Sequence, residues 1–119
     1  MINVEIFRDK DYIIGFEVKG HANFAKYGED IVCAAISVLS QTSLMSLIEV
    51  CSIEERKLDY SIDDETGFLE IKLPKNLDRE SLKKSQIVLK TFELGVKSII
   101  ESYPNNVALV NRRCNKWLS

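Results

Sequence analysis

The N-terminal stretch of the chain, residues 2–19, reads INVEIFRDKDYIIGFEVK. Apolar side chains stand at every second position on both sides of its centre: Ile2, Val4, Ile6, and then Ile14, Phe16 and Val18. A period of two is typical of a β-strand with one buried face. The polar residues 8–11 between the two halves favour a turn. This stretch therefore predicts two antiparallel strands joined as a hairpin.

A second hairpin is predicted further along the chain. Residues 58–62 and 68–73 are rich in strand-forming side chains, and the segment DDETG at 63–67 joins them as a turn. Pro74 ends the second of these strands. Residues 107–110 give a possible short last strand.

Two helices are predicted from apolar residues that recur at three- and four-residue steps. The first helix runs from Asp30 to about Val50, and the second from Asp78 or Ser81 to about Ser102. The element order is then β-β-α-β-β-α with a possible last strand. This order predicts an α+β fold in which an antiparallel sheet, made of two β-hairpins, packs with two helices.

The length of 119 residues indicates a single domain, placed at residues 1–110, and a C-terminal tail at 111–119. The net charge of -2 and the sequence pI of about 5.5 count against a protein that binds nucleic-acid phosphates. We therefore expect no direct nucleic-acid binding. The basic segment 111–117 is interpreted as part of a solvated tail.

The start of the chain lacks the basic and apolar regions of a signal peptide, and no apolar run approaches the roughly 20 residues that cross a bilayer. We therefore expect a cytoplasmic protein without membrane contact. The odd number of cysteines, at Cys33, Cys51 and Cys114, is typical of reduced thiols. With one histidine and no CxxC spacing, neither a metal site nor a cofactor is expected.

The sharpest chemical feature is a histidine and a cysteine on either side of one loop. Residues 20–22 read GHA, and residues 30–35 read DIVCAA. If Asp30 is the N-cap, Cys33 is the third helical residue, where the helix dipole and unpaired N–H groups favour its thiolate. His21, directly after a strand, could take the thiol proton and later protonate a leaving amine.

Each of these residues also has a purely structural interpretation. Cysteine is among the most buried residue types, so the residues alone leave a structural Cys33 and a Cys–His site as equal alternatives. Ser37 lies one turn after Cys33, where it either lines the pocket or bonds back to a carbonyl. Asp30 caps the helix, orients His21 or does both, and capping alone is favoured. Cys51, at a helix C-terminus, and Cys114, in the tail, are weaker candidates.

The sequence resembles the bacterial ribosomal-processing cysteine proteases, also called Prp or YsxB-like proteins. The resemblance covers residues 1–110 and rests on GHA at 20–22, on YGEDIVCAAIS at 27–37 and on QT at 41–42. The second helix followed by Tyr-Pro at 103–104 is also similar. Asn23 departs from the pattern, because glycine is common there in the family.

The resemblance implies a cysteine endopeptidase in which His21 and Cys33 are the catalytic pair. It also implies a homodimer. The implied substrate is the large-subunit ribosomal protein L twenty-seven, whose N-terminal extension is removed after a short apolar motif with paired phenylalanines. We place the dimer contact on the second helix or on an edge strand.

The loop between His21 and Cys33 is expected to border the substrate. Its candidate contacts are Gly20, Ala22, Phe24, Tyr27 and Gly28, with the two glycines as flexible points. Two rival hypotheses remain at this stage. One is a non-catalytic, ribosome-associated binding module with a structural cysteine, and the other is a thiol-dependent acyl transferase that uses the same pair.

Overall fold

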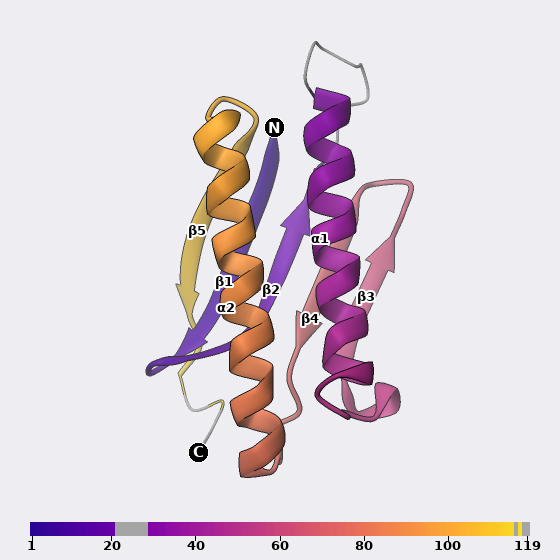
Figure 1. Ribbon diagram of the computed structural model, residues 1–119, viewed down its shortest axis with the longest axis vertical. Helices are drawn as coiled ribbons and strands as arrows, with labels where there is room; N and C mark the ends of the chain where they lie inside the picture. Colours follow the sequence, from indigo (N-terminus) through magenta and orange to yellow (C-terminus); the bar gives the residue numbers. More distant parts are fainter. Residues whose placement is uncertain (21–28, 116, 118–119) are drawn as a thin grey trace.

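A computed structural model describes residues 1–20, 29–115 and 117 (Figure 1). Its elements follow the predicted order, with a single 3-10 turn added before the second hairpin. Their bounds are β1 (Ile2–Asp9), β2 (Tyr12–Lys19), α1 (Glu29–Glu49), η1 (Glu55–Lys57), β3 (Asp59–Asp63), β4 (Phe68–Lys72), α2 (Arg79–Ser102) and β5 (Val107–Arg113).

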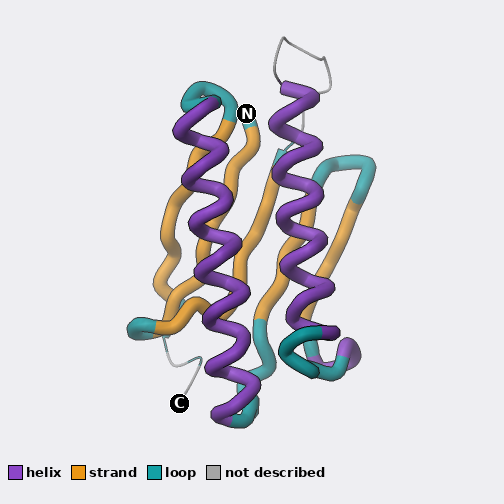
Figure 2. The backbone as a smooth tube through the Cα atoms, in the orientation of Figure 1, coloured by secondary structure: helices purple, strands orange, loops and turns teal. Residues whose placement is uncertain are grey.

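The five strands form one sheet in the order β3-β4-β2-β1-β5, and both helices cover the same face of it (Figures 1 and 2). β1 pairs antiparallel with β2, as β3 does with β4, so the two predicted hairpins are confirmed. The hairpins join each other through antiparallel pairing of β2 with β4. The predicted α+β class is therefore confirmed.

The last strand differs from the expectation in direction and in length. β5 pairs parallel with β1, so the sheet is mixed, and it runs to Arg113, three residues past the predicted boundary at 110. Residues 111–113 were interpreted as tail because the basic segment that they begin is short and terminal. On an edge strand the backbone supplies the pairing, and polar side chains can face solvent. Arg112 also pairs with Glu5 on β1, at 2.9 Å between Nη2 and Oε2.

Helix α2 is fastened to the sheet by specific polar and aromatic contacts. Gln86 forms two hydrogen bonds with the backbone of Ile13 on β2, one donated by Ile13 N–H and one accepted by its carbonyl, each 2.8 Å long. Phe92 stacks on Phe16, with ring centroids 3.8 Å apart. Asp78 caps the helix by accepting the Ser81 N–H at 2.8 Å, as one of the two predicted starts implied.

Helix α1 packs on the sheet through an apolar face that includes Val32, Ile36 and Leu47, all buried. Residues 31–48 contain no charged side chain, and the segment Ile31–Glu49 is long and apolar enough, by length and composition, to cross a membrane. The expectation that no apolar run has this length is therefore wrong. The apolar run includes serines whose hydroxyl groups bond within the helix. Ser43, for example, donates its hydroxyl to the Leu39 carbonyl at 2.7 Å.

Candidate active site

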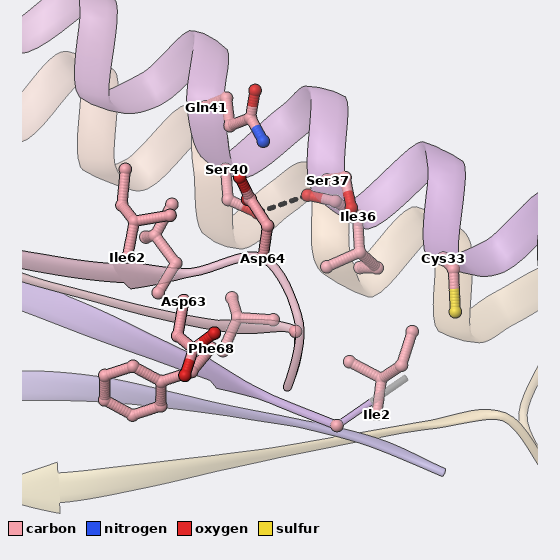
Figure 3. Close-up of a pocket in the computed structure, with 14 residues that line it drawn as sticks. Ile2, Cys33, Ile36, Ser37, Ser40, Gln41, Ile62, Asp63, Asp64 and Phe68 are labelled. Carbon is pink, nitrogen blue, oxygen red and sulfur yellow. Dashed lines mark hydrogen bonds between the residues drawn. The ribbon is translucent and has the colours of Figure 1, made fainter. Parts of the chain in front are cut away.

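A groove of about 220 Å³ lies between α1 and the hairpin of β3 and β4, with the starts of β1 and α1 at one end (Figure 3). Its walls come from four parts of the fold. They are Ile2 of β1, Val18 and Gly20 at the end of β2, five residues of α1 (Cys33, Ile36, Ser37, Ser40, Gln41), and the hairpin residues Ile62, Asp63, Asp64, Gly67, Phe68 and Leu69.

Cys33 is partly exposed, and its thiol lines this groove. Figure 3 shows Sγ pointing off α1 on the side where Ile2 lies. The helix begins at Glu29, so Asp30 lies within the first turn instead of capping the helix, and Cys33 is the fifth helical residue instead of the third. The first-turn N–H groups therefore stand about one turn before the thiol, and their support for thiolate is weaker than the sequence suggested.

The predicted base and most of the predicted substrate loop lie outside the described residues: His21, Ala22, Phe24, Tyr27 and Gly28. For Asp30 the backbone is described and the side chain is not. Gly20 is described, and it lines the groove directly before His21 in the chain.

Gly20 has a structural requirement of its own. Its φ is +95°, and a Cβ at this position would lie 2.7 Å from the Met1 carbonyl oxygen. Glycine is therefore needed here for a left-handed backbone and a close approach of two chain segments. Gly20 was expected to be a flexible point of the loop. Its surroundings indicate a different role, which is to allow the close packing of its backbone against Met1.

Ser37 lines the same groove as Cys33, as the four-residue spacing predicted. The alternative for Ser37 was a hydrogen bond from its hydroxyl to a backbone carbonyl of the preceding turn. A bond of this kind is formed by Ser40, whose hydroxyl donates to the Ile36 carbonyl (Figure 3). Ser37 is exposed, so its hydroxyl is open to a bound peptide.

The hairpin wall of the groove was not predicted. Asp63 and Asp64 were interpreted only as turn residues, and Phe68 only as the start of a strand. Turn chemistry does explain Asp63, whose Oδ1 accepts the N–H groups of Glu65 at 3.0 Å and Thr66 at 3.4 Å. The sequence signal for a second role was the run of acidic residues at 63–65, but only the strand order places it opposite α1.

The two other cysteines are in different surroundings. Cys51 is 1% exposed, and burial raises the pKa of its thiol, which disfavours the reactive thiolate. Cys114 follows β5, and its N–H donates to the Arg8 carbonyl at 2.7 Å. Among the described residues no group of three His, Cys, Asp or Glu side chains could hold a metal ion.

Comparison with known proteins identifies relatives over nearly the whole chain. Residues 1–108 match the family model described as cysteine protease Prp. The chain is 32% identical over 108 residues to the ribosomal processing cysteine protease Prp of Bacillus subtilis, which covers 90% of this chain and 94% of that protein. It is 30% identical over 110 residues to the Staphylococcus aureus protein of the same name, with 92% and 97% covered.

Solved structures agree. A crystal structure of the Staphylococcus aureus protease in complex with a substrate peptide is similar, with a TM-score of 0.78 and 28% identity over 94% of this chain and 100% of that chain. A crystal structure from Streptococcus mutans gives a TM-score of 0.82 at 29% identity over 96% of each chain. The chain therefore belongs to the Prp family of cysteine proteases, which act in ribosomal processing.

Proposed function

We propose that this protein is a cytoplasmic cysteine endopeptidase that removes the N-terminal extension of ribosomal protein L twenty-seven, with Cys33 as the nucleophile and His21 as its base. The observation that carries the proposal is the thiol of Cys33 in the wall of the groove between α1 and the β3–β4 hairpin. Neither of the other two cysteines lines this groove.

The proposed reaction has two covalent steps. His21 takes the proton of the Cys33 thiol, and the thiolate attacks the scissile carbonyl carbon. A carbon–sulfur bond forms, the carbon–nitrogen bond breaks, and His21 returns the proton to the leaving amine. Water, deprotonated by His21, then attacks the thioester, releases the acid product and restores the thiol. A covalently linked product peptide is present in a crystal structure of the Staphylococcus aureus relative, which supports this route.

The groove favours apolar substrate side chains. Its floor and walls include Ile2, Val18, Ile36, Ile62 and Phe68. Burying one phenylalanine side chain is worth about 1.5–3 kcal/mol, so two of them could dominate recognition. We expect a peptide with the paired-phenylalanine motif to bind in this groove by burying its two aromatic side chains against these apolar residues.

A direct test incubates the protein with a peptide that spans the extension and detects products by mass spectrometry. One cut after the paired phenylalanines is expected, together with little cleavage of casein. Replacing both phenylalanines by alanine should lower kcat/KM at least about tenfold. The Cys33→Ala protein is the matched control and should give no product. Transfer of the acyl group to an added amine, without hydrolysis in water, would instead indicate an acyl transferase.

We also propose a homodimer, and the outer face of α1 is the surface that best supports it. Ile31, Val38 and Met45 stand seven residues apart, and their exposed fractions are 62%, 66% and 55%. This spacing is typical of a helix–helix seam. The sequence placed the contact on α2 or on an edge strand. The outer face of α2 is less suitable, because it carries charged pairs such as Lys84 with Glu80.

Light scattering at micromolar concentration tests the assembly. The wild-type protein should give twice the 13.6 kDa chain mass. Val38→Asp should give the single-chain mass, whereas Ile87→Asp, an equally exposed position on α2, should leave the dimer intact. A wild-type protein that shows only the single-chain mass contradicts the proposal.

A further inference from the structure

The two long walls of the groove differ in charge. The α1 wall carries the thiol of Cys33 and the neutral polar side chains of Ser37, Ser40 and Gln41. The hairpin wall carries Asp63 and Asp64, which are the charged residues among the described residues that line the groove. Among the described residues, the negative charge that faces a substrate peptide at Cys33 therefore comes from the hairpin wall.

The two carboxylates have different partners. Asp63 is committed to its own turn through the N–H groups of Glu65 and Thr66. Asp64 is exposed, and within the described part of the chain its carboxylate forms neither a hydrogen bond nor an ion pair. Figure 3 shows the side chain of Asp64 projecting from the hairpin toward the part of α1 that carries Ser37 and Ser40. Asp64 is thus the carboxylate that is free to bind a substrate group.

The position of Asp64 along the groove sets which substrate residue it meets. Ser37 and Gln41 lie about 6 Å and 12 Å from Cys33 along the axis of α1, at 1.5 Å per residue. An extended peptide advances about 3.3 Å per residue. A carboxylate opposite Ser37 and Ser40 therefore faces a residue two or three positions from the bond that Cys33 attacks.

We propose that Asp64 is a specificity residue, which selects substrates with a lysine or arginine two or three positions from the scissile bond. This inference rests on the proposed function. A cationic side chain reaches the carboxylate while its methylene groups lie along Phe68 and Ile62 in the same wall. An ammonium or guanidinium group forms a charge-assisted hydrogen bond there, which a neutral side chain cannot replace.

A peptide series tests the assignment. Each peptide carries the paired phenylalanines and one lysine, alanine or glutamate at a position from three residues before to three residues after the cut. At one position, two or three residues from the cut, lysine should raise kcat/KM about five- to tenfold over alanine, mainly through KM. The preference should weaken at high salt, because the groove is open to solvent.

Three variants locate the effect. Asp64→Asn should abolish the lysine preference, so that this variant cleaves the lysine and alanine peptides with equal kcat/KM. Asp64→Lys should reverse the preference toward glutamate. Asp59→Asn, an equal change of charge at the far end of β3, should keep the wild-type pattern. Equal cleavage of lysine and alanine peptides by the wild-type protein, or an unchanged preference in Asp64→Asn, overturns the proposal and leaves the endopeptidase assignment standing. A wild-type protein that cuts none of the peptides overturns both.

Discussion

Helices α1 and α2 lie side by side on the same face of the sheet, yet the sequence equips them for different tasks (Figure 2). α2 has an outer face with several charged side chains, an N-cap at Asp78 and fixed contacts to β2 through Gln86 and Phe92. α1 has no charged residue between Asp30 and Glu49, and it carries the nucleophile beside a groove.

The difference shows how a small domain separates stability from chemistry. The contacts that fix α2 are buried and specific, so their loss is felt by the whole fold. The side chains of α1 that line the groove, such as Cys33, Ser37 and Gln41, are at least partly exposed and can change with little effect on packing. Substitutions in matched pairs can test this division.

The largest effect on function is expected at Cys33. Cys33→Ala should abolish turnover and leave the free energy of unfolding nearly unchanged, because the thiol lies at the groove surface. Cys51→Ala should keep activity and lower stability by about 1 kcal/mol, because Cys51 is buried. Brief treatment with iodoacetamide near neutral pH, followed by peptide mapping, should label Cys33 ahead of Cys51 and Cys114. Equal labelling of all three thiols in the folded protein would contradict the assignment.

The largest effect on stability is expected at Phe92. Phe92→Ala should lower the free energy of unfolding by about 3–5 kcal/mol, since it removes a fully buried ring from its stack on Phe16. Phe92→Leu provides a milder variant if the alanine protein does not fold. Leu94→Ala is the control on the same helix, because Leu94 is 65% exposed and should change stability by less than about 0.5 kcal/mol. Urea unfolding measures all three, and a neutral Phe92→Leu would refute the account of α2.

A pair of glutamines gives the next contrast. Gln86→Ala leaves the N–H and carbonyl of Ile13 without their partner in a buried position, and should cost about 1–3 kcal/mol. Gln41→Ala, on the exposed groove side of α1, should leave the urea midpoint unchanged. Equal losses of stability in the two variants would contradict the view that the polar contacts of α2 stabilise the fold and those of the groove side of α1 do not.

The smallest effects are expected at two aspartates near the helix starts, Asp78, which caps α2, and Asp30, in the first turn of α1. Asp78→Ala should lower Tm by a few degrees through loss of the cap. The Ser81 N–H that Asp78 accepts holds the pKa of this carboxyl below its ordinary value. Its contribution is therefore present above the ordinary carboxyl pKa and is lost as the pH falls through the lowered one. The difference in Tm between wild type and Asp78→Ala should shrink on acidification, and a constant difference would exclude an ionised cap.

The matched change in α1 is Asp30→Asn. If Asp30 also orients His21, which was one of the alternatives from the sequence, kcat/KM should fall while Tm stays within a degree or so of the wild-type value. Full activity in this variant would limit Asp30 to a structural role in the first turn of α1.

Local sequence patterns were sufficient for most of the elements. The alternation in residues 2–19 requires two strands, and the three- and four-residue apolar steps require two helices, because both patterns follow from backbone geometry alone. The placement of Ser37 beside Cys33 is of the same kind, since residues four apart share one face of a helix. The start of α2 at Asp78 follows from its capping chemistry.

Only the tertiary structure decided what lies across from those elements. Nothing local distinguishes the polar residues 111–113 of β5 from a tail, because their place in the sheet depends on backbone pairing with β1. The groove depends in the same way on the strand order, which brings Asp64 and Phe68 to the wall that faces α1, some thirty residues after Cys33 in the chain. Local propensities depend on a few consecutive residues. Contacts between distant segments, such as those that form the groove, depend on the packing of the whole core.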